Sequence, residues 1–336
     1  MKKERTEKKR LAILRIIQAA NGPISSQKIT EQLVNMAYNI SERTVRFHLL
    51  DMDREGLTEY VGRHGRKITE KGGLELANAR VFEKVGFLAA KIDQMTYSMD
   101  FNLSKKEGTV VVNISLIGKN QLKKAIPLIS RVFETGFAMG KLVTLFNEGE
   151  QIGDVIIPDG FVGIGTVCSI SLNGVLLQQG VPIVTRFGGL LEIQNRKPAR
   201  FVEIISYDGT SLDPLEIFIK GEMTDTMGVV ESGNGRIGAS FREIPVVSRT
   251  QVVQIGRRLH EIGLGGFLEI GWPGQPIFEV PINEGRIGAV VAGGLNPSAG
   301  LRESGMNVNS RALSGLIDFH KLYHYRELGV RAEEIL

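Results

Sequence analysis

Residues 41–52 have the sequence SERTVRFHLLDM, which carries a strong helical signal near the start of the chain. Ser41 can cap a helix, because its side chain can accept a hydrogen bond from a free amide of the first turn. Val45, Leu49 and Met52 then recur at the spacing of one helical face, and Gly56 can end the helix. The stretch therefore predicts an amphipathic helix whose other face is polar and basic.

The flanking segments complete a winged helix-turn-helix. One helix is predicted from 6 to 20 and a second up to 36, each with a stripe of apolar residues, and Ser25 or Ser26 can cap the second. Strands are predicted at 58–61 and 67–69, joined by a turn rich in glycine and arginine. Three helices followed by such a hairpin are typical of a nucleic-acid-binding domain.

The exposed face of the third helix and the tip of the wing are the parts of such a domain that contact DNA. The candidate DNA-binding residues are Ser41, Arg43, Thr44, Arg46, Phe47, His48, Arg63, His64, Arg66 and Lys67. Residues 1–80 carry 16 Lys/Arg against 10 Asp/Glu, whereas the rest of the chain carries 25 against 27. The basic surplus is therefore N-terminal, as expected for binding to a nucleic acid. RNA binding and a winged helix that contacts only protein are the alternatives.

The remaining chain predicts a larger domain of mixed α/β class. Apolar spacing from 74 to 97 predicts one long connecting helix, and the runs at 109–117, 120–139 and 141–146 follow a β-α-β order. We therefore expect a winged-helix domain over 1–75, a linker helix over 76–100 and a glycine-rich regulatory domain over 101–330.

Two short motifs recur in the glycine-rich part. Residues 188–193, GGLLEI, return at 265–270 as GGFLEI, and GRIGA occurs at both 235–239 and 285–289. We interpret these as a duplicated β-rich half related by a pseudo-twofold axis. Chance similarity between glycine-rich turns is the alternative.

Ligand pockets often form where related halves meet, so the repeated arginines are candidates to bind carboxylates. The candidate effector-binding residues are Thr166, Cys168, Ser169, Arg236 and Arg286. An exposed arginine in a hairpin turn and a cysteine buried for packing are the alternatives for these motifs.

Several classes of protein are excluded or disfavoured. Cys168 is the only cysteine, so no intramolecular disulfide and no multi-thiolate zinc site can form, and a cytoplasmic location is expected. The apolar stretch 155–172 contains Pro158, Asp159 and glycines, which argue against a membrane span. The aspartates after residue 80 are not clustered, and phosphate-loop, nucleophile-elbow and zinc-helix motifs are missing. We expect neither catalytic residues nor a metal or cofactor.

A ribonuclease R type winged helix followed by GTVCSISLNGVLLQQGVPIV at 165–184, FGGLLEI at 187–193 and the two GRIGA segments resembles the archaeal nitrogen regulatory repressors of the NrpR family. The resemblance covers about residues 10–325. It implies a repressor of nitrogen-assimilation genes that leaves its operators when 2-oxoglutarate occupies a single regulatory domain, with the family's cysteine region at Cys168.

We expect a homodimer on a palindromic double-stranded operator, and a requirement for a second regulatory-domain protein is the alternative. An RNA-binding or nucleic-acid-processing accessory protein is the alternative function.

Overall fold

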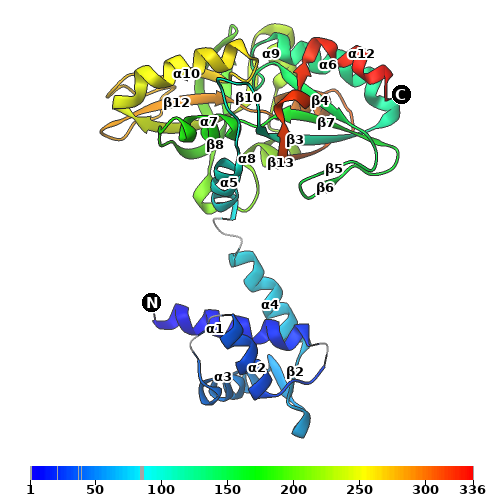
Figure 1. The fold of residues 1–336 in the computed structure, drawn as a ribbon, viewed down its shortest axis with the longest axis vertical. Coiled ribbons are helices and arrows are strands. Elements are labelled where there is room, and N and C mark those ends of the chain that lie inside the picture. The colour runs from blue at the N-terminus through cyan, green and yellow to red at the C-terminus, as the bar shows by residue number, and fades with distance from the viewer. Residues whose placement is uncertain (1, 21, 37, 39, 84–86, 336) are drawn as a thin grey trace. The chain divides into compact units, whose positions relative to one another are not determined.

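The computed structural model describes residues 2–20, 22–36, 38, 40–83 and 87–335 (Figure 1). The chain divides into two compact units, Met1–Val85 and Gly86–Leu336. Each unit has its own hydrophobic clusters and is described by itself. Within the described residues, no helix is long and apolar enough to cross a membrane.

The first unit is a winged helix-turn-helix, as predicted. Its elements are α1 (Lys2–Ala19), α2 (Ser26–Asn35), α3 (Glu42–Arg54), β1 (Thr58–Tyr60), the 3-10 turn η1 (Gly62–His64), β2 (Arg66–Ile68) and α4 (Glu70–Glu83). The Ser25 and Ser41 side chains accept hydrogen bonds from the amides of Lys28 and Thr44, so both serines cap their helices as predicted. Ile29, Leu33, Val45, Leu49 and Met52 are fully buried with the apolar face of α1.

The wing is tied to the segment before α2. β1 and β2 pair antiparallel, and Ile24 exchanges two backbone hydrogen bonds with Arg66, at 2.9 and 3.0 Å. Gly65 lies beside this bridge with φ of 103°, a region that residues with a Cβ rarely adopt. An added Cβ would lie 2.1 Å from the carbonyl oxygen of Ile24, so only glycine fits here.

The predicted long helix over 74–97 is described as two helices. α4 begins at Glu70, before the predicted start, and Leu76 is buried in the core of the first unit. α5 (Phe87–Ser98) belongs to the second unit, where Leu88 and Ile92 are buried. Residues 84–86, which would join the two helices, lie outside the described residues. The apolar stripe is therefore divided between two different cores.

The second unit contains two five-stranded sheets, in the orders β13-β3-β7-β4-β14 and β11-β12-β10-β8-β9. The first series of elements is β3 (Thr109–Gly118), η2 (Lys119–Gln121), α6 (Leu122–Glu134), β4 (Leu142–Phe146), β7 (Phe161–Val167), α7 (Ile170–Gln178) and β8 (Val184–Gln194). The second series is β10 (Gly235–Pro245), η4 (Val246–Ser248), α10 (Arg249–Glu261), β11 (Phe267–Ile270), β12 (Arg286–Ala292), α11 (Asn296–Glu303) and β13 (Asn309–Asp318). In Figure 1, α6 and α10 lie along the same side of the strands of this unit.

The two series are a structural duplication in the same order. Gly118, the last residue of β3, pairs with Phe161, the first residue of β7. In the second series Pro245, the last residue of β10, likewise pairs with Arg286, the first residue of β12. A three-residue 3-10 turn and a helix of 13 residues then follow in each series.

The predicted repeat therefore paired the wrong segments. The two GRIGA motifs begin β10 and β12, which are the first and third strands of one series. GGLLEI lies in β8 and FLEI in β11, which are a fourth and a second strand. A duplication does exist, but the short motifs that recur do not mark it. Their similarity reflects glycine-rich strands in one sheet.

The last strand of each series is exchanged. β8 leaves the first series to pair with β10, and β13 leaves the second series to pair with β3. The helices that precede these strands also pack against the other series: α11 packs against α6, and α7 shares a hydrophobic cluster with α10. Each sheet is therefore completed by a strand from the other series.

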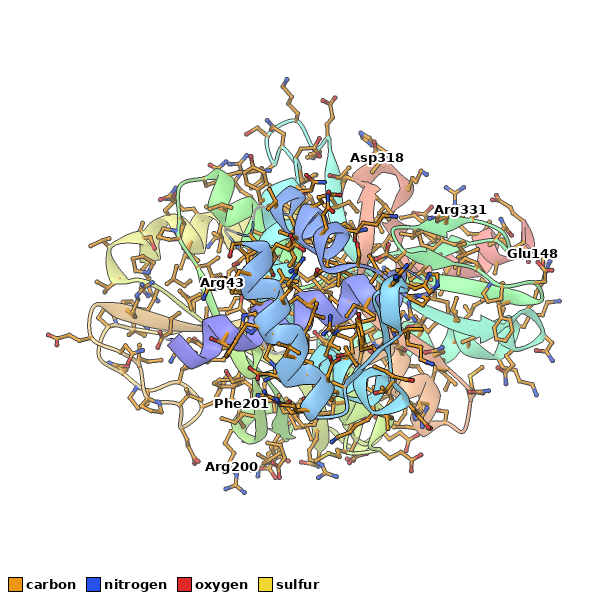
Figure 2. All side chains as sticks on the ribbon, turned by 90° about the horizontal axis from the view of Figure 1, so that it is seen from below. Arg43, Glu148, Arg200, Phe201, Asp318 and Arg331 are labelled. Atoms are coloured by element: carbon orange, nitrogen blue, oxygen red, sulfur yellow. The ribbon has the colours of Figure 1, made fainter. Side chains whose placement is uncertain are left out.

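The other elements lie at the sheet edges or between the series. They are the hairpin β5 (Gln151–Ile152) and β6 (Val155–Ile156), β9 (Lys197–Ser206), η3 (Tyr207–Gly209), α8 (Pro214–Lys220), α9 (Thr226–Ser232), η5 (Phe319–Lys321), β14 (Tyr323–His324), η6 (Tyr325–Glu327) and α12 (Leu328–Glu333). β9 forms one edge of its sheet and carries Arg200 and Phe201, both labelled in Figure 2.

The tight approach at the wing gives a testable prediction. Gly65→Ala should destabilise the first unit by about 2 kcal/mol or more, because it adds a Cβ at positive φ against the Ile24 backbone. Gly73→Ala is the control, since its added Cβ meets no atom within 4 Å and α4 gains a better helix former. Amide hydrogen exchange of α2 and α3 measures both changes. Equal protection in the two variants would contradict the prediction.

Candidate functional site

The exposed face of α3 in the first unit carries several of the predicted DNA-binding residues. Arg43, labelled in Figure 2, is exposed near the start of the helix, and Phe47 is 62% exposed one turn later. Arg46 is also exposed, but its guanidinium is bound to the carboxylate of Glu42. A basic and aromatic face on the first turns of the third helix is suited to contact bases and phosphates.

Three predicted DNA-binding residues serve the fold. His48 is only 7% exposed, so its side chain offers little surface to DNA, and burial holds its pKa below the usual value. Ser41 caps α3. Thr44 is half-buried, and its hydroxyl lies 3.0 Å from that of Ser41. These three residues therefore contribute to the cap and the packing of α3.

The wing residues differ in the same way. Arg63 and His64 are exposed at the tip. Arg66 points inward, because its Nε donates to Asp53 at 2.8 Å and its side chain is only 13% exposed. Lys67 is exposed, with its Nζ 3.2 Å from Glu59. The cationic tip of the wing therefore rests mainly on Arg63, and Arg66 holds the wing against α3.

In the second unit, Arg242 on β10 is fully buried. Its Nε donates to the side-chain oxygen of Asn173 at 2.8 Å, and its Nη1 donates to Ser240 at 2.8 Å. Nη2 donates to the carbonyl and the hydroxyl of Ser169, at 3.1 and 3.0 Å. All of these acceptors are neutral, and within the described residues Arg242 forms no ion pair. Burial lowers its pKa to about 10, so the group stays charged at neutral pH.

A cavity of about 460 Å3 is separated from this arginine by Asn173, since Arg242 is not among the residues that line it. Asn173, which holds Arg242, lines the cavity, and its amide nitrogen donates to Thr185 at 2.9 Å on the same wall. Thr96 of α5 also lines the cavity, and its buried hydroxyl has no hydrogen-bond partner among the described residues. The cavity is large enough for a small organic ligand.

The predicted effector residues divide into three groups. Ser169 holds Arg242, and Cys168 is buried next to it. Thr166 is buried too, and its hydroxyl donates to the carbonyl of Gly294 at 2.7 Å. Arg236 and Arg286 lie at opposite ends of the antiparallel β10–β12 pair, so they do not form one site. The η-nitrogen Nη1 of Arg286 is buried without a partner among the described residues.

Sequence reasoning missed Arg242, Asn173 and Thr185. The available signal was the pair Arg242 and Glu243, two charged residues inside a strand whose other central residues are apolar or small. A charged residue in such a strand indicates a functional or paired position. The duplicated position supports this, because Ser115 of β3 replaces Arg242 there and, within the described part of the chain, its hydroxyl bonds to those of Ser298 and Ser310.

A winged helix with exposed basic residues on its third helix, followed by a larger α/β unit, is the arrangement of a winged-helix regulator. Residues 85–324 match the family model described as NrpR regulatory domains NRD1 and 2, and residues 11–76 match the ribonuclease R winged-helix domain. The chain therefore belongs to the NrpR family of nitrogen regulators.

Relatives with this name cover most of the chain. The global nitrogen regulator NrpRI of Methanosarcina mazei is 34% identical over 94% of this chain and 97% of its own length. The global nitrogen regulator NrpR of Methanococcus maripaludis is 30% identical over 92% of this chain, which spans 54% of that protein. The crystal structure of a nitrogen repressor-like protein from Methanococcus jannaschii has a TM-score of 0.61 at 27% identity, covering 70% of this chain and 97% of that one. This protein is accordingly a regulator with a nitrogen-regulatory domain.

The two wing arginines should respond differently to substitution. Arg63→Ala should weaken binding to all DNA sequences and lower the salt dependence by about one counterion, because Arg63 is exposed. Arg66→Ala should instead lower the stability of the first unit by about 1 to 3 kcal/mol, since it leaves Asp53 without its cation. Salt titrations of DNA binding and denaturant unfolding separate the two effects. A loss of stability in Arg63→Ala would refute the assignment.

The thiol of Cys168 should be unreactive in the folded protein. Burial raises its pKa to about 11, so little thiolate is present at pH 8. We expect alkylation by iodoacetamide to be slower than in the urea-unfolded chain by a factor of a hundred or more, on the order of the thiolate loss alone. Mass spectrometry of the labelled chain measures both rates. Rapid labelling of the native chain would show that the thiol is accessible.

Proposed function

We propose that this protein is a DNA-binding transcriptional repressor of nitrogen-assimilation genes that releases its operators when 2-oxoglutarate binds in the cavity lined by Asn173. The proposal rests on a fully buried guanidinium, that of Arg242, which donates to Asn173, a neutral residue that lines a ligand-sized cavity. The proposal assigns no catalytic residue and no cofactor to the chain, and the nitrogen regulators to which the chain is similar support this role.

The electrostatics of the buried arginine support an anionic ligand. Moving an ion out of water costs several kcal/mol, and in proteins this cost is usually offset by a counterion. The groups that accept hydrogen bonds from Arg242 are all neutral, so a carboxylate bound in the cavity would bring a negative charge closer to it. Attraction between charges is also stronger here than at the surface, because little water is present.

The cavity lining suits a small keto acid in part. Asn173, Thr185 and Thr96 offer polar groups for carboxylate and keto oxygens. Asp93 and Asp208 also line the cavity and are exposed, so the attraction for an anion comes from Arg242 and the neutral donors. A dicarboxylate would place one carboxylate toward Asn173 and Arg242.

Ligand binding would act through α5. This helix lines the cavity with Ile92 and Thr96, and it is the first helix of the second unit along the chain. A ligand that fits one position of α5 better than another shifts the population of that position. In a homodimer on a palindromic operator, such a shift changes the spacing of the two recognition helices. A second regulatory-domain protein would add to this assembly without altering the site.

The resemblance to the ribonuclease R winged helix supports RNA as a second candidate ligand. DNA is favoured because exposed Arg43 and Phe47 lie on one face of α3, the helix that enters the wide major groove of B-DNA. The major groove of an RNA helix is too narrow for side chains to reach its bases. Competition between matched DNA and RNA duplexes for the full chain distinguishes the two.

The effector site is tested with Arg242→Met. This change removes the buried charge but leaves the acceptors of Asn173, Ser169 and Ser240 without their donor, so the melting temperature of the variant without ligand is measured first and should be lower than that of the native chain. At 100 times the dissociation constant, 2-oxoglutarate should stabilise the native chain by roughly 2.7 kcal/mol and should not stabilise the variant. Thermal unfolding with and without the ligand measures this difference.

Arg286→Met and Arg236→Met are the matched controls, because each removes one arginine elsewhere on the same sheet. Both should keep the response to 2-oxoglutarate. Loss of the response in either control, with Arg242→Met unaffected, would place the ligand elsewhere. A native chain that 2-oxoglutarate neither stabilises nor releases from DNA would refute the proposed regulation.

A further inference from the structure

The guanidinium of Arg46 is fixed along one of its two donor edges. Its Nε and Nη2 both donate to the same oxygen of Glu42, Oε1, at 3.1 and 2.7 Å. Nε also lies 3.2 Å from the hydroxyl of Ser26. The side edge of the guanidinium is therefore occupied, whereas Nη1 forms no bond among the described residues. The end formed by Nη1 and Nη2 faces outward on a side chain that is 65% exposed.

Glu42 is fixed in turn by α2. The hydroxyl of Ser26, the first residue of α2, donates to Oε1 of Glu42 at 2.9 Å. These bonds hold the pKa of Glu42 below its usual value, with the Ser26 bond as the largest cause and Arg46 as the next. Glu42 is therefore ionised at neutral pH and can only accept hydrogen bonds. The position of Arg46 is set by both helices of the helix-turn-helix.

Such a pair contributes little to stability. Exposed ion pairs four residues apart on a helix are worth only a few tenths of a kcal/mol. The pair can still favour binding. An arginine whose rotamer is already fixed loses less conformational entropy when it binds a partner. The pair is better explained by what the free end of Arg46 contacts than by the helix itself.

We propose that Ser26 and Glu42 are positioning residues that aim the free Nη1–Nη2 end of Arg46 at a guanine in the major groove. The inference rests on the proposed function, because it requires that the first unit bind DNA. Guanine presents two acceptors, O6 and N7, on its major-groove edge, and the two donors at the end of a guanidinium match them. Adenine presents one acceptor and one donor on the same edge, so it does not match.

Other arginines of α3 lack this support. Arg43 is exposed and has no bonded partner among the described residues. Arg54 is 79% exposed in the last turn and lies 3.5 Å from Asp51, at the limit of a hydrogen bond. The first turns of a recognition helix are the ones that reach base edges. Arg46 therefore differs from these arginines because it lies in the first turns of α3 and its guanidinium is held by Glu42 and Ser26.

The test selects binding sites from a random pool of DNA duplexes with the full chain. The native chain should enrich a motif with an invariant guanine, favoured over other bases by about 5- to 150-fold in competition. Arg46→Lys keeps the positive charge but lacks the paired Nη1 and Nη2 donors of the guanidinium. It should bind unselected DNA about as well as the native chain does, while the preference for that guanine falls below about threefold.

The positioning role is tested with Glu42→Ala and Glu42→Gln. Glu42→Ala retains Arg46 but should lose most of the guanine preference, while its affinity for unselected DNA rises because a negative charge has left the surface. Glu42→Gln should restore part of the preference, since an amide oxygen can accept the same bonds. A purely structural role for Glu42 would instead lower the melting temperature and all DNA binding together, and that result would overturn the inference.

Arg54→Lys is the matched control and should select the native motif. If Arg46→Lys or Glu42→Ala also selects the native motif with the guanine intact, the inference is wrong and the proposed function stands. If the native chain enriches no sequence, the proposed function fails and the inference fails with it.

Discussion

The exchange of strands between the two halves of the second unit is the constraint on which the rest of that unit depends. β10 lies between β12 of its own series and β8 of the other, and β3 lies between β7 and β13 in the same way. Each central strand therefore takes one of its two neighbouring strands from the other series. Because a sheet edge left unpaired exposes a row of backbone groups, neither half can form its sheet completely without the other.

The proposed effector site lies where exchanged pieces meet. Arg242 comes from β10, whereas Asn173 and Ser169 come with α7 from the first series. At the corresponding position in the other half, the described residues place three serine hydroxyls together, so the two halves share a scaffold and differ in charge. A buried cation persists in one of them, and its cost in free energy is the reason to look for a counterion there.

The first unit could be predicted from the sequence because its information is local. Serine caps, apolar spacing on α3 and glycines in the wing act over a few residues, and each appears in the structure as expected. Which exposed residues are free depends on contacts between distant segments, so the roles of Arg66 and His48 could not be derived. The support of Arg46 by Ser26 joins two different helices, and the sequence pattern of either helix does not predict that contact.

The second unit was harder to predict for a physical reason. Its duplication lies in strand register and helix length, which tolerate many sequences, whereas the motifs that recur in the sequence belong to unrelated strands. The exchange of β8 and β13 has a thermodynamic consequence. If one half unfolded alone, the central strand of the other half would lose a neighbouring strand. The free energy of unfolding one half therefore approaches that of unfolding the whole unit. Despite its two sheets, the unit should melt as one.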